Sequence, residues 1–125
     1  MMARTVLVRR LLLVLALFPA AAVAQELFGA FAYSAKEKKH GWAINYPTKE
    51  AAEKAALEHC QKNAETCQNI LWFRNACGAL VTGPEGFGAE WAEDQTHAVN
   101  KALKACATRS SSCAVTATYC TAKQK

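Results

Sequence analysis

The sequence predicts an α+β domain in which a β-β-α-β unit occurs twice, forming a mostly antiparallel sheet with two helices packed on one face. Three observations predict it: a duplication at a spacing of 46 residues, helical periodicity with capping residues in each copy, and six cysteines that suit disulfide bonds. The chain has 125 residues, 52% hydrophobic and 20% charged. That is enough for one domain and too apolar for a disordered chain.

Residues 1–24 are predicted to be a cleaved signal peptide. Three arginines in the first ten residues precede an apolar run, and Ala22-Val23-Ala24 supplies the small-x-small pattern that signal peptidase recognises. The alternative is a membrane anchor, but the uncharged stretch 11–24 is shorter than the ~20 residues that span a bilayer. We therefore expect a periplasmic or secreted protein that does not span the membrane after cleavage.

The mature chain, residues 25–125, is predicted to be a single duplicated domain with copies at about 28–76 and 77–120. The leader holds three arginines and no acid, which leaves 12 basic against 10 acidic residues and a net charge of +2. Basic and acidic residues are interleaved, so the basic footprint of a nucleic-acid binder is missing. We expect no nucleic-acid partner.

Each copy contains a predicted helix with recognisable ends. Thr48 and Asp94 are good N-caps, because their side-chain oxygens accept from unpaired first-turn amides. The helices are expected to end near Cys60 and Cys106. Small residues recur at helical spacing on one face, which lets each helix approach a sheet closely. These residues coincide at the 46-residue shift: Ala52, Ala56, Ala98 and Ala102.

Strand-like segments flank both predicted helices. Turn residues separate them, notably His40-Gly41 and the run GPEG at 83–86. We expect most of the large aromatic rings on these strands to fill the core against the alanine stripes of the helices. The predicted strands are residues 28–33, 42–46, 69–75, 79–82, 87–91 and 114–119.

All six cysteines lie in the mature region, and an even count in a short exported domain indicates disulfides. Six cysteines allow 15 pairings, but the duplication favours Cys60–Cys67 and Cys106–Cys113 as equivalent bridges. Cys77 and Cys120 break the repeat, since their counterparts at the 46-residue shift are Phe31 and Arg74, and are left to pair with each other. Zinc and redox sites would favour C-x-x-C spacing, which is absent, so we expect no metal and no cofactor.

Two segments resemble the bacterial domain-of-unknown-function family 4189: GWAINYPT at 41–48, followed by the helix that ends at Cys60, and WFRNACGAL at 72–80. The resemblance covers most of residues 28–120, and 72–80 is its most specific part. The second half departs from it at 86–91, where family members often show Gly-Trp alternation. The resemblance implies a small exported bacterial protein with no assigned activity.

No catalytic constellation is recognisable in the sequence. His59 adjoins Cys60, but neighbouring helical residues point about 100° apart, and a disulfide-bonded cysteine has no thiolate to offer. The other candidate groups lack a nucleophile, base and orienting partner in a known pattern. They are His40, His97, Glu90, Glu93, Asp94, and the serines Ser110, Ser111 and Ser112. A small hydrolase is therefore the weakest hypothesis, and we expect the protein not to be an enzyme.

Binding is the favoured function class, because aromatic and arginine side chains are the usual anchors of interfaces. One hypothesis is a protein-binding module of the inhibitor or immunity type, with loop 34–41 or 83–88 protruding. The alternative is binding of peptidoglycan or another glycan, with sugars stacked on Trp42 or Trp91. The candidate binding residues are Trp42, Tyr46, Trp72, Arg74 and Trp91.

Overall fold

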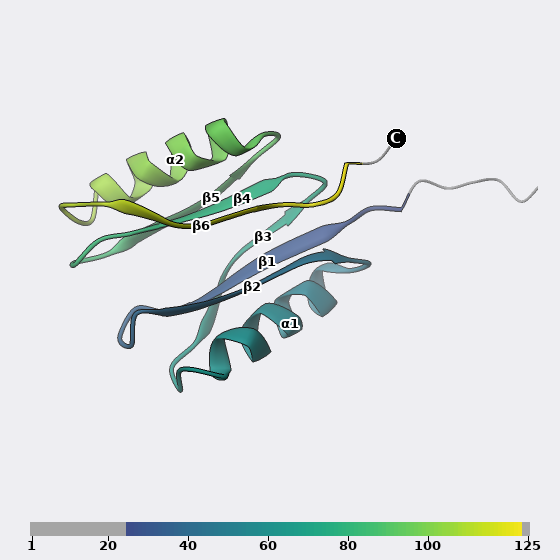
Figure 1. Ribbon diagram of the computed structural model, residues 1–125, viewed down its shortest axis with the longest axis horizontal. Helices are drawn as coiled ribbons and strands as arrows, with labels where there is room; N and C mark the ends of the chain where they lie inside the picture. The colour runs from purple at the N-terminus through teal and green to yellow at the C-terminus, as the bar shows by residue number, and fades with distance from the viewer. Residues whose placement is uncertain (1–24, 124–125) are drawn as a thin grey trace, which may run out of the picture.

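The computed structural model describes residues 25–123, so the predicted signal peptide lies outside the described residues. Six strands and two helices follow one another in the order β-β-α-β, twice (Figure 1). The first copy comprises β1 Phe28–Ser34, β2 Lys39–Tyr46, α1 Lys49–Gln61 and β3 Gln68–Arg74. The second comprises β4 Cys77–Thr82, β5 Phe87–Ala92, α2 Gln95–Ala107 and β6 Ala114–Cys120. The predicted α+β class and the duplication are confirmed.

The strands form two antiparallel three-stranded sheets, ordered β2-β1-β3 and β5-β4-β6. The sheets lie face to face, and each carries one helix on its outer face, which gives four layers (Figure 1). The sequence predicted one sheet with both helices on the same face, and this detail is wrong. The central strands β1 and β4 are buried on both faces, so each needs a second layer opposite its helix.

The two faces of a central strand carry different kinds of side chain. On β1, Ala30 and Ala32 pack against α1, whereas Phe31 and Tyr33 enter the layer between the sheets. Successive side chains of a strand point to opposite faces, so small and large residues are sorted into separate interfaces. The aromatic rings therefore pack mainly between the sheets and not, as predicted, against the alanine stripes.

Phe73 lies in the centre of the layer between the sheets and is 1% exposed. Its ring meets Phe31 edge-on, with ring centroids 5.7 Å apart. A β-carbon added to Gly29 or to Gly78 would overlap this ring. These two glycines, one on each central strand, leave the space that Phe73 fills.

The helices touch their sheets at two equivalent glycines. A β-carbon on Gly41 of β2 would overlap backbone atoms of Ala56 and Cys60, and one on Gly88 of β5 would overlap the Ala102 carbonyl oxygen of α2. Gly41 was predicted to lie in a turn, but it lies within β2. The turn is formed by residues 35–38, with Lys38 at a φ of 56°.

The three predicted disulfides are confirmed: Cys60–Cys67, Cys106–Cys113 and Cys77–Cys120. Cys77 and Cys120 are directly opposite each other on β4 and β6. The residues in the same position on β1 and β3 are Phe28 and Arg74, so Phe28, and not Phe31, corresponds to Cys77. The simple shift fails at this strand because β1 and β2, with seven and eight residues, are longer than β4 and β5, with six each.

Three disulfides indicate an oxidising, non-cytoplasmic environment, because such bonds persist where thiols are not kept reduced. Within residues 25–123, no helix combines the length and apolar character needed to cross a bilayer.

Each hairpin also anchors the loop that follows its helix. Glu37 accepts hydrogen bonds from the Thr66 hydroxyl at 2.8 Å and from the N–H groups of Glu65 and Thr66, both at 2.9 Å. Glu85 accepts from the hydroxyls of Ser110 and Ser111, each at 2.9 Å. These bonds, led by those from Thr66 and Ser110, hold the pKa of each carboxyl below its ordinary value.

Candidate functional site

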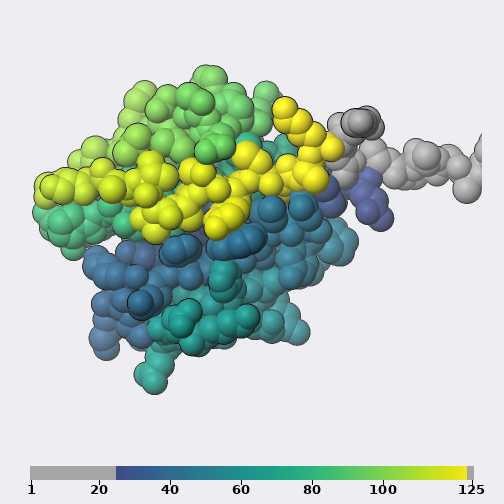
Figure 2. Space-filling view, viewed as in Figure 1, coloured from purple at the N-terminus to yellow at the C-terminus, as the bar shows by residue number. Residues whose placement is uncertain are grey.

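The five candidate binding residues lie at two opposite edges of the sandwich. Trp42 and Tyr46 belong to β2, which runs beside β6. Figure 2 shows the atoms of these segments next to each other, in blue for β2 and in yellow for β6. Trp72 and Arg74 belong to β3, which lies beside β5 and its Trp91. The structure therefore divides the candidates into a pair and a group of three.

Trp42 joins the two halves of the molecule. Its ring stacks on Tyr119 of β6, with centroids 3.9 Å apart and an interplanar angle of 14°. Its backbone N–H donates to Nδ1 of His59 on α1 at 3.0 Å, and the two rings meet edge-on. Tyr46 is 37% exposed beside a cavity of about 480 Å³. Tyr119 therefore covers one face of the Trp42 ring, and Trp42 lines this cavity together with Tyr46.

The group of three lines a groove at the other edge. We call it the β3–β5 groove; its volume is about 410 Å³. Trp72 is 42% exposed and Trp91 is 46% exposed, whereas their neighbour Phe73 is buried. The lining residues are Ile70, Leu71, Trp72, Phe73, Arg74 and Trp91. The groove therefore combines a largely apolar wall with a single guanidinium group.

Two lysines extend the positive charge of the β3–β5 groove. Lys49 Nζ of α1 lies 4.8 Å from the centroid of the Trp72 ring, and Lys101 Nζ of α2 lies 5.3 Å from that of Trp91. Arg74 is 3.4 Å from Glu26, and Lys101 is 3.8 Å from Glu90. Sequence reasoning missed both lysines, because their approach to the rings depends on how each helix crosses its sheet.

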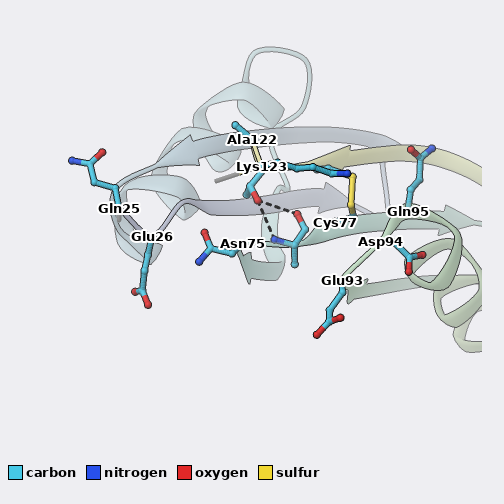
Figure 3. Close-up of a pocket in the computed structure, with 12 residues that line it drawn as sticks. Gln25, Glu26, Asn75, Cys77, Glu93, Asp94, Gln95, Ala122 and Lys123 are labelled. Atoms are coloured by element: carbon cyan, nitrogen blue, oxygen red, sulfur yellow. Dashed lines mark hydrogen bonds between the residues drawn. A yellow bond between two sulfur atoms is a disulfide. The ribbon is translucent and has the colours of Figure 1, made fainter. Parts of the chain in front are cut away.

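A larger cavity, of about 830 Å³, lies near the two ends of the described chain (Figure 3). The Cys77–Cys120 disulfide lines it, while the carboxylates of Glu26, Glu93 and Asp94 do not point toward one another. Asp94 caps α2: its carboxylate accepts from the His97 N–H at 2.9 Å, and this bond and the His97 side chain hold its pKa low. This cavity brings no two of the three carboxylates together.

The sequence-level candidates for chemistry occupy structural positions. Cys60 is bonded to Cys67, and His59 contacts the backbone of β2. The pKa of His40 is lowered, first by burial and second by the neighbouring His59. The Ser110 and Ser111 hydroxyls donate to Glu85. Cys60, His59, Ser110 and Ser111 therefore each have a local partner within the fold.

A family model described as a domain of unknown function (DUF4189) matches residues 28–120. The chain belongs to this family. Neither the curated proteins nor the solved structures give a match. The DUF4189 match includes both segments on which the resemblance rested, residues 41–48 and 72–80, and it spans both copies of the repeat.

Proposed function

We propose that this DUF4189 domain is an exported, non-catalytic module of the bacterial envelope that binds another protein at the β3–β5 groove. The observation that carries the proposal is the convergence of Trp72, Trp91 and Arg74 on one groove. Tryptophan and arginine are enriched among the residues that dominate binding energy at protein interfaces. The two exposed rings would be covered by the partner.

The scaffold behind the groove suits binding without rearrangement. Three disulfides and a packed aromatic layer fix the strands that carry the groove. A rigid surface loses less conformational entropy when it binds, so more of the contact energy appears as affinity. This favours the inhibitor or immunity type of module.

Glycan binding has less support from the same geometry. Sugar stacking was expected on Trp42 or Trp91, but Tyr119 covers one face of Trp42 and Lys101 lies over the ring of Trp91. A protein partner requires no open, flat platform, because its side chains reach between the rings. Glycan binding is therefore the alternative that the experiment below distinguishes from protein binding.

The test compares three forms of the mature chain as bait in envelope extract: wild type, Trp91→Ala, and Val115→Ala. Val115 is 48% exposed on β6, outside the groove, and is the matched control. We expect one protein to be retained by wild type and by Val115→Ala, and its affinity to fall about thirtyfold in Trp91→Ala. Equal retention by all three forms would contradict the proposal. Sedimentation with purified sacculi that Trp91→Ala abolishes would favour the glycan.

A further inference from the structure

We propose that the β3–β5 groove receives an extended, acidic segment of the partner, which pairs its backbone with β3 as an added strand. This inference rests on the proposed function and specifies the chemistry of the partner. Strand addition needs a free sheet edge with outward backbone groups and pockets for alternate side chains.

The direction of the β3 backbone follows from one hydrogen bond. Asn75 directly follows β3, and its N–H donates to the Leu27 carbonyl oxygen at 2.8 Å. The backbone N–H of Asn75 therefore points toward the β1 side of the strand. In an antiparallel pair the residues alternate between facing the neighbour and facing away. Phe73 therefore faces β1, and the backbone groups of Trp72 and Arg74 point outward from the sheet.

Side chains already occupy the two edges formed by β2 and β5. On β5, Lys101 donates to the Trp91 carbonyl oxygen at 2.7 Å and Arg109 donates to that of Phe87 at 3.1 Å. On β2, His59 accepts from the Trp42 N–H. Within residues 25–123, β3 has no such side-chain bond to its outward backbone. Its edge is open to a strand from another chain.

The equivalent edge of β6 differs in chemistry. The residues equivalent to Trp72 and Arg74 are Thr118 and Cys120. Thr118 accepts a hydrogen bond from Gln95 at 3.1 Å, and Cys120 is bonded to Cys77. In the described part of the chain, two exposed indole rings, Trp72 and Trp91, lie beside β3, whereas the exposed ring beside β6 is Tyr46 of β2.

Charge and apolar surface together specify the sequence of the incoming segment. Arg74 is the one charged residue that lines the β3–β5 groove. The ammonium groups of Lys49 and Lys101 lie over the rings of Trp72 and Trp91, respectively. Glu26 and Glu90 balance two of these three cations. A segment in which acidic side chains alternate with apolar ones would place the acids near the cations and the apolar groups between the rings.

The experiment uses a displayed library of random twelve-residue peptides, selected on the mature domain. We expect enrichment of alternating apolar and acidic sequences, and protection of the Trp72 and Arg74 amides from hydrogen exchange when the best peptide binds. Its affinity should fall at least tenfold further in Trp72→Pro than in Trp72→Ala, because proline also removes the outward N–H. Thr118→Pro is the matched control on β6 and should bind like wild type.

A second measurement leaves the domain unchanged. The best peptide is resynthesised with N-methyl groups on alternate amides, which blocks pairing along one of its sides; one of the two methylated versions should lose binding. Strand addition would be overturned if both methylated versions retained binding, or if the peptide bound Trp72→Pro and Trp72→Ala with equal affinity. Selection of peptides without acidic residues would overturn the acidic character of the segment. If the partner still depends on Trp91 in that event, the proposed function stands; if it does not, both fail.

Discussion

The outer strands β3 and β6 occupy equivalent positions in the two halves, yet their edges have different chemistry. Trp72 and Arg74 of β3 correspond to Thr118 and Cys120 of β6, and the Phe28–Arg74 pair of the first sheet is replaced by the Cys77–Cys120 disulfide of the second. One edge is covalently tied to its neighbour, whereas the other exposes aromatic surface. The two halves therefore share one scaffold and differ in the chemistry of their outer edges.

Both halves share the same close contact between the helix and its sheet. Gly41 and Gly88 let the helix backbone approach, and one short disulfide closes the end of each helix. Glu37 and Glu85 fix equivalent loops through different donors. If the two halves are energetically equivalent, matched substitutions in each should change the free energy of unfolding by similar amounts.

The largest effect is expected for Phe73→Ala, which removes the ring at the centre of the shared layer. The loss should be about 3–5 kcal/mol of the free energy of unfolding, as for other buried phenylalanines. The control is Trp72→Ala, its exposed neighbour, with a loss of about 1 kcal/mol. Denaturant unfolding followed by fluorescence and circular dichroism measures both. Two separate transitions in wild type would show that the halves do not depend on this layer.

The stabilisation that each disulfide gives should increase with the length of chain that it encloses. Replacing Cys77 and Cys120, 43 residues apart, by alanine is expected to cost about 4 kcal/mol, against about 2.5 kcal/mol for either seven-residue bridge. The double variant at Cys60 and Cys67 should match that at Cys106 and Cys113 within error. Chemical denaturation of the three double variants gives the ranking, and a large difference between the two short bridges would break the equivalence of the halves.

Alanine at Gly41 or at Gly88 should destabilise the domain by about 1–3 kcal/mol, because the added methyl group pushes the helix backbone away from the strand. We expect the two single variants to have similar melting temperatures. The effects should add in the double variant, since the sites lie in different halves. A neutral result at one site would show that its helix shifts without cost, and the two contacts would no longer be equivalent.

The smallest effects concern the two loop glutamates. Because their folded-state pKa values are lowered, they stabilise the fold above the unfolded-state pKa, and this contribution is lost as the pH falls through the folded-state pKa. Glu37→Gln and Glu85→Gln should each reduce the fall in unfolding free energy as the pH is lowered below about 4.5. Urea unfolding between pH 3 and pH 7 measures this pH dependence of the unfolding free energy. Glu93→Gln, at an exposed residue outside both loops, is the matched control for the loss of one carboxylate.

The local parts of this fold could be predicted from the sequence. Both helix caps, all six strands and the three disulfides follow from short-range patterns and from the duplication. The two-sheet arrangement could not, because an alternation of Ala30 with Phe31 shows that both faces are apolar but not what covers each one. The sequence predicts a turn at Gly41 for the same reason, because the α1 backbone that the glycine contacts follows β2 in the chain and leaves no local sign at residue 41.

The candidate site was predictable only as a set of residue types. Trp72, Arg74 and Trp91 were candidates, but their convergence depends on β3 lying beside β5 in the other sheet. Trp42 was an equal candidate, and one face of its ring is covered by Tyr119, which is distant in the sequence. Side-chain chemistry can be read from the sequence, whereas exposure depends on packing between the halves.

Each of the three disulfides lies within a single half, so the contact between the halves is non-covalent. The two halves are joined by a two-residue corner, Asn75-Ala76, at which Asn75 has a φ of 47°. Two copies of the chain could therefore exchange halves reciprocally, with every sulfur keeping its partner, if this corner opened. Such an intertwined dimer would contain no disulfide between its chains, so it would separate in denaturant without a reductant, and short hinges are known to invite that exchange.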